Sequence, residues 1–94
     1  MSQAAWLLLA QAQFSLGDYP AAEAAYREAL LGAAPQGVSR ETLQEAMATA
    51  IYRHAEQQRA AGDSEAAAGT FQRAAGAAPG SSLQAMAQYD AAAS

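Results

Sequence analysis

The sequence predicts an all-α protein in which helix hairpins repeat, with about five helices and an unusually long third one. Apolar residues make up 52% of the 94 residues, and about thirty residues are alanine, the strongest helix former. β-branched residues are few, which argues against a sheet. Gly-Asp occurs at Gly17 and again at Gly62, and the residues that follow each copy match.

Each Gly-Asp copy opens the same pattern of small and aromatic residues. An alanine follows the glycine by five positions, an aromatic residue comes four positions later, and a second alanine three after that. These residues are Ala22, Tyr26 and Ala29 in the first copy and Ala67, Phe71 and Ala74 in the second. Two matched copies in a short chain indicate an internal helical repeat.

A first helix is expected over residues 2–15, with one inward face at helical spacing. The residues of that face are Trp6, Leu9, Ala10 and Gln13. Leu7 and Leu8 make the other side apolar as well, and a helix that is apolar nearly all round is usually buried on both sides. Leu7 and Leu8 therefore form a candidate oligomer face, or a face for a preceding repeat. The alternative is a terminal helix that leaves some leucine exposed.

A second helix is expected from about Pro20 to Leu31. Gly17 can end the first helix, Asp18 can cap the second, and proline is tolerated in a first turn. The glycine- and proline-containing segment 32–38 ends this helix.

The third helix is predicted to be long. The two Gly-Asp turns, at Gly17 and Gly62, lie 45 residues apart, whereas the simplest helix-pair repeat has a period of about 34. The surplus of about eleven residues equals about three helical turns. Ser39 can cap this helix, and no helix breaker occurs before Gly62.

A fourth helix is expected over residues 64–76, ended by Pro79 and Gly80. Ser81 or Ser82 should cap a fifth helix that carries Leu83, Met86, Ala87 and Tyr89, and residues 90–94 should fray. We therefore expect one domain over residues 1–94, with repeat one at 3–35, repeat two at 39–79 and a terminal helix at 81–92. Two alternatives stay open, a whole domain and a piece excised from a longer array.

Composition and charge exclude several functions. The net charge is −4 and all five basic residues are arginines, which argues against nucleic-acid binding and membrane attachment. No signal peptide is visible, and the apolar run near the start is too short to span a membrane. The chain lacks cysteine, and its one histidine, His54, is expected in a partly buried position. No metal, cofactor or enzyme activity is expected.

The two copies resemble the tetratricopeptide repeat, whose pattern places Trp, Leu and a small residue before an Ala-x3-Phe half and a final proline. The matching residues of the first copy are Trp6, Leu9, Ala10, Ala22, Tyr26, Ala29 and Pro35, with Gln13 in place of an aromatic. Those of the second copy are Ile51, His54, Ala55, Gln58, Ala67, Phe71, Ala74 and Pro79. The segment 78–89 is similar to repeats of bacterial envelope proteins of this family. The localisation is left open between the bacterial cytoplasm and the periplasm.

The resemblance implies a right-handed superhelix with a concave groove that binds a peptide or helix of a partner protein. By motif register the groove residues of the first repeat are Ala4, Leu8, Gln11 and Ser15, and those of the second are Thr49, Tyr52, Arg53, Glu56 and Arg59. The second set also follows one face of the third helix by periodicity alone. An outward Tyr52 between Arg53 and Arg59 would suit an acidic ligand.

Two alternatives remain open at this stage. Arg53, Glu56 and Arg59 can form a solvated face in which Glu56 pairs with either arginine. The chain can also be a self-association element that forms a homo-oligomer through Leu7 and Leu8, or by exchanging helices between copies, since fewer than three repeats usually need further neighbours.

Overall fold

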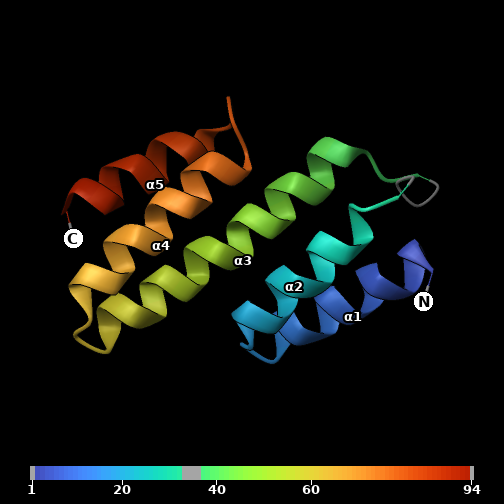
Figure 1. Ribbon diagram of the computed structural model, residues 1–94, viewed down its shortest axis with the longest axis horizontal. Helices are drawn as coiled ribbons and strands as arrows, with labels where there is room; N and C mark the ends of the chain where they lie inside the picture. Colours follow the sequence, from blue (N-terminus) through green and yellow to red (C-terminus); the bar gives the residue numbers. More distant parts are fainter. Residues whose placement is uncertain (1, 33–36, 94) are drawn as a thin grey trace.

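The computed structural model describes residues 2–32 and 37–93, which form five α-helices and no strand. The helices are α1 (Gln3–Ser15), α2 (Tyr19–Ala29), α3 (Arg40–Ala60), α4 (Ser64–Ala77) and α5 (Ser82–Ala93). Each helix packs against the next one in the chain, and α5 also contacts α3. Figure 1 shows the α1–α2 hairpin beside one end of α3 and the α4–α5 pair beside the other. The predicted all-α helix-hairpin fold is confirmed.

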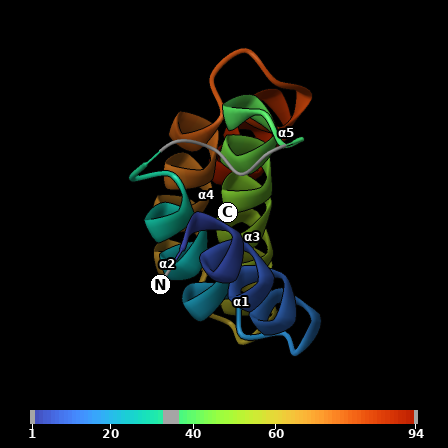
Figure 2. The ribbon, with the colours of Figure 1, turned by 90° about the vertical axis from the view of Figure 1, so that its right-hand side faces the viewer.

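The helices lie in two layers. In the end-on view of Figure 2, α2 and α4 lie on one side and α3 and α5 on the other, with α1 in front of α3. The molecule is elongated, with extents of 38, 27 and 16 Å. In the chain, the helices alternate between the two sides. This alternation places α1, α3 and α5, the first helix of each hairpin and the terminal helix, in corresponding positions.

The two Gly-Asp turns have the same geometry, as the repeat predicts. Gly17 and Gly62 adopt φ of 80° and 88°, a left-handed conformation that glycine reaches without steric cost. The next residue, Asp18 or Asp63, caps the following helix by accepting a hydrogen bond from the third residue after it, Ala21 or Ala66. The aspartate amide in turn donates to the carbonyl five residues earlier, at 3.0 Å in one turn and 2.9 Å in the other. Internal repetition is thus present at the level of single hydrogen bonds.

The predicted long third helix is also confirmed. α3 is 21 residues long, about 31 Å at 1.5 Å per residue. It contributes to both hydrophobic cores: Leu43 and Ala50 pack with α1 and α2, whereas Ile51, Tyr52 and Ala55 pack with α4 and α5. The surplus residues of the repeat therefore make α3 a helix shared by both cores.

The helix ends differ from the expected ones in three places. α2 ends at Ala29 with Leu30 as its C-cap, and α4 continues to Ala77. Ser39 and Ser81 cap α3 and α5 as expected. The prediction that residues 90–94 fray is wrong for the described residues, because α5 continues through Asp90 to Ala93. Pro35 of the first repeat lies outside the described residues.

A buried carboxylate joins the two hairpins. Glu23 of α2 is 7% exposed and accepts from Arg27 at 2.5 Å and from Arg73 of α4 at 3.0 Å. Arg73 lies 50 positions later in the chain. Because a buried charge is costly unless it is paired, this contact favours one arrangement of α4 relative to α2.

Candidate partner-binding groove

The predicted groove residues of α1 lie on one exposed strip. Ala4, Leu8, Gln11 and Ser15 are all exposed, and Leu8 keeps 67% of its surface. Leu7, in contrast, is half-buried and packs against the first core with Trp6 and Phe14. The predicted Leu7–Leu8 face is therefore corrected to Leu8 alone, because the α1–α2 core takes up Leu7.

The predicted groove residues of α3, from Thr49 to Arg59, form a polar strip along that helix. Thr49 and Glu56 are half-exposed and Arg53 is exposed, and Arg53 donates to Glu56 at 2.9 Å. A hollow of about 220 Å³ lies between this strip and α5. Its lining residues are Glu45, Thr49, Ser81, Ser82, Leu83 and Met86. Because residues of α5 line this hollow together with Thr49, α5 lies along one edge of the predicted groove.

Tyr52 does not face outward, and this expectation is wrong. Tyr52 as a whole residue is 9% exposed, and its ring packs edge-on against Phe71 with the ring centroids 5.1 Å apart. Its hydroxyl donates to the carboxylate of Asp90 on α5. Tyr52 lies at the border of the α3 strip, and the approach of α5 covers it.

Arg59 is directed at the same carboxylate. Its Nη1 lies 3.4 Å from Asp90 Oδ1, and its guanidinium carbon lies 5.0 Å from the centroid of the Phe71 ring, within cation–π range. Tyr52 and Arg59 therefore contact a carboxylate, whereas the sequence analysis expected them to bind an acidic ligand. The carboxylate belongs to the chain itself.

Burial and the neighbouring Asp90 together raise the pKa of the Tyr52 phenol. Desolvation raises the pKa of the Tyr52 phenol to about 12, with further contributions from the hydrogen bond to Asp90 and from the charges of Asp90 and Glu56, while Arg59 acts in the opposite direction. The phenol therefore remains protonated and can donate to Asp90 over the neutral range.

Two exposed apolar side chains on α5 extend the surface beyond the predicted residues. Met86 is 50% exposed and Tyr89 is 76% exposed, and Met86 lines the hollow beside Thr49. Sequence reasoning placed both residues on the fifth helix without assigning them to the groove. Their spacing of three residues places them on neighbouring parts of one helix surface, and this spacing was the available signal.

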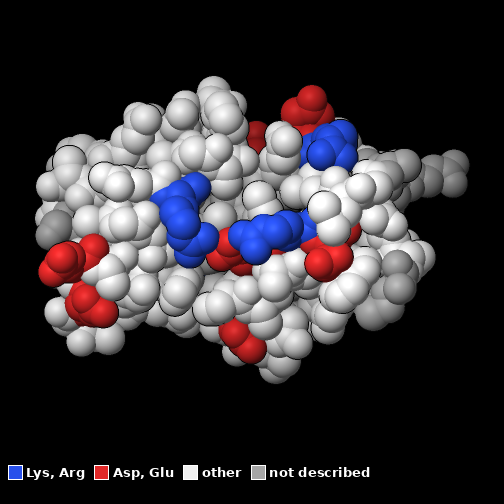
Figure 3. All heavy atoms as spheres, viewed as in Figure 1, with Lys and Arg blue, Asp and Glu red and all other residues white. Residues whose placement is uncertain are grey.

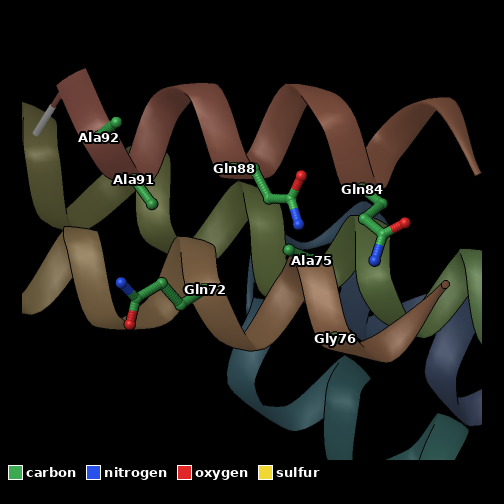
Figure 4. Close-up of a pocket in the computed structure, with 7 residues that line it drawn as sticks. All are labelled: Gln72, Ala75, Gly76, Gln84, Gln88, Ala91 and Ala92. Atoms are coloured by element: carbon green, nitrogen blue, oxygen red, sulfur yellow. The ribbon is translucent and has the colours of Figure 1, made fainter.

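A second groove lies between α4 and α5, away from α3 (Figure 4). Its volume is about 490 Å³. Three glutamines and four small residues line it: Gln72, Gln84, Gln88, Ala75, Gly76, Ala91 and Ala92. None of these side chains is charged, so the groove offers amide hydrogen bonds and close backbone approach.

Charged side chains of opposite sign lie beside one another in the middle of the face shown in Figure 3, with no broad basic area there. Each of the five arginines has a partner in the structure. Arg27 and Arg73 pair with Glu23, Arg53 with Glu56 and Arg59 with Asp90, and Arg40 donates to the carbonyls of Leu30 and Gly32. Among residues 2–32 and 37–93, no helix has the length and hydropathy to cross a membrane. The same residues contain no cluster of three or more metal-ligating side chains.

In comparisons with protein-family models, curated protein sequences and solved structures, no match to this chain was found. The tetratricopeptide resemblance therefore remains a prediction that rests on the residues named above.

Proposed function

We propose that this protein binds a peptide or a helix of a partner protein along the surface formed by α1, α3 and α5. The supporting observation is the exposure of Leu8, Met86 and Tyr89 on the first and last of these helices. Met86 lies beside Thr49 of the polar α3 strip, where both residues line one hollow. Exposed apolar anchors beside polar groups are typical of protein-binding surfaces.

The groove requires little rearrangement to receive a ligand. The α3 strip is one face of a continuous helix, fixed from behind by the two cores. A preformed surface of this kind loses little conformational entropy on binding. Affinity then comes from burial of the apolar anchors, and Thr49, Arg53 and Glu56 provide polar selectivity.

The test is selection of peptides from a random display library against the full chain, followed by calorimetric titration of the selected peptides. The Met86→Ser/Tyr89→Ser variant should weaken binding at least tenfold, because it removes about 2 kcal/mol of apolar burial. Leu31→Ser is the matched control, since Leu31 is 73% exposed but follows α2. Equal loss in both variants, or no selected peptide, would rule out the groove.

The exposure of Leu8 also supports a second candidate function, self-association into a homo-oligomer. Leu8 and Leu16 expose 67% and 79% of their surface on or next to α1. Light scattering after size exclusion at micromolar concentration should then show a dimer or larger species. Leu8→Glu should convert it to a monomer, and Arg53→Glu should not.

A further inference from the structure

A shared carboxylate brings two arginine side chains together on the face formed by α2 and α4. Arg27 Nη2 and Arg73 Nη1 donate to the same oxygen, Glu23 Oε2, at 2.5 and 3.0 Å. The Glu23 side chain is 9% exposed, whereas the side chains of Arg27 and Arg73 are 60% and 51% exposed. The carboxylate is therefore covered, while both arginines remain accessible to solvent and lie side by side.

This arginine pair carries more positive charge than its carboxylate can balance. Two arginines share one glutamate, so the three side chains together have a net charge of +1. The other described ion pairs, Arg53–Glu56 and Arg59–Asp90, each contain a single arginine and are neutral. A guanidinium group has five N–H donors, and the bonds to the glutamate use one nitrogen of each group. Donors therefore remain for one further anion.

The helix surface beside Arg73 is low. Gly69 and Gly76 lie four residues before it and three residues after it on α4, so the three residues share one helix face. A Cβ atom added at either glycine would meet nothing within 4 Å, so packing within the chain does not require glycine there. Glycine within a helix costs about 1 kcal/mol relative to alanine. The two glycines leave the α4 backbone open, and a partner can approach Arg73 closely.

We propose that Arg27 and Arg73 bind a carboxylate side chain of a partner protein on the face formed by α2 and α4. A carboxylate carries one negative charge and balances the net charge of +1, whereas a doubly charged phosphate would reverse it. Its two oxygens can accept hydrogen bonds from both guanidinium groups, which are the favoured donors to carboxylates. Because Glu23 already holds the two arginines, their side chains lose little conformational entropy on binding.

The proposed carboxylate site is separate from the groove proposed above. In Figure 2, α2 and α4 lie on one side of the molecule and α3 and α5 on the other. The two surfaces can therefore be tested independently, and the Met86→Ser/Tyr89→Ser variant should bind a carboxylate at the arginine pair as the wild type does.

The probe is a capped pentapeptide with one glutamate between two pairs of alanines, compared with the same peptide carrying glutamine. NMR signals of the arginine side-chain N–H groups should shift for Arg27 and Arg73 together and saturate at millimolar glutamate peptide. The glutamine peptide should leave them unshifted. Arg73→Gln and Arg27→Gln should each weaken binding about fivefold or more, because each removes one of the two positive charges. If Arg73→Gln does not fold by circular dichroism, Arg27→Gln makes the same test, since it keeps the contact between α2 and α4.

Two further variants separate a specific site from general charge attraction. Arg53→Gln makes the same charge change on α3 and should leave the affinity for the glutamate peptide unchanged within about twofold. Glu23→Gln should tighten binding about fivefold, because it removes the competing negative charge. Equal shifts with the two peptides, or equal losses of affinity in Arg53→Gln and Arg73→Gln, would overturn the proposal. Tighter binding of inorganic phosphate than of the glutamate peptide at equal ionic strength would also overturn it.

Discussion

The two hairpins share a turn and an aromatic core residue but differ in how the next helix covers them. In the 45-residue register between Gly17 and Gly62, Leu7 corresponds to Tyr52 and Phe14 to Arg59. Leu7 and Phe14 pack in the apolar core with residues of α3. Tyr52 and Arg59 instead hold the Asp90 carboxylate of α5. One repeat pattern thus produces an apolar junction with α3 and a second junction, with α5, that adds a hydrogen bond and an ion pair to its apolar contacts.

The largest effect should come from the core of the second hairpin. Phe71 is completely buried, so Phe71→Ala should lower the free energy of unfolding by about 3–5 kcal/mol. Because Tyr52 and Arg59 both rest on this ring, amide hydrogen exchange should rise most in α5 and least in α1. Phe71→Leu should cost only about 1 kcal/mol. A uniform rise in exchange across the chain would contradict the distinction between the two junctions.

The shared turns should respond equally. Gly17→Ala and Gly62→Ala each force a side chain into a left-handed conformation, at φ 80° and 88°, and should each cost about 1–2 kcal/mol in chemical denaturation. Gly69→Ala is the matched control, because Gly69 lies within α4 with open space at its Cβ position. That change should stabilise the protein by about 0.5–1 kcal/mol. A large difference between the two turns would show that their equivalence is only geometric.

Alkaline pH should lower the stability that the contact between Tyr52 and Asp90 of α5 contributes. The pKa of Tyr52 rises from 10.0 to about 12 on folding, so the unfolded chain releases this proton first as the pH rises. The stabilisation is complete below pH 10 and is lost as the pH approaches 12. Tyr52→Phe should therefore show a smaller decrease in unfolding free energy across this interval. Identical pH profiles for the variant and the wild type would refute the assignment.

The smallest effect concerns the polar strip of α3. The Arg53 and Glu56 side chains are 52% and 35% exposed, and exposed pairs of this kind contribute only a few tenths of a kcal/mol. Arg53→Ala should leave the thermal midpoint nearly unchanged, while it alters peptide binding if the groove is used. A marked loss of stability would show that Arg53 has a structural role.

Most of the fold could be predicted from local signals. The turns follow from glycine and aspartate, the helix starts from Ser39 and Ser81, and the length of α3 from the absence of a breaker. The position of Tyr52 could not be predicted in this way. Periodicity places it at the edge of an exposed strip, and its burial depends on Asp90, 38 positions later.

Because one helix belongs to both cores, the protein has no internal boundary at which it could be divided. A cut within α3 would leave each half with an incomplete core. Local opening should therefore begin at the outer helices and proceed inward. The amides near the middle of α3 should be the last to exchange with solvent, and their exchange should report the unfolding of the whole chain.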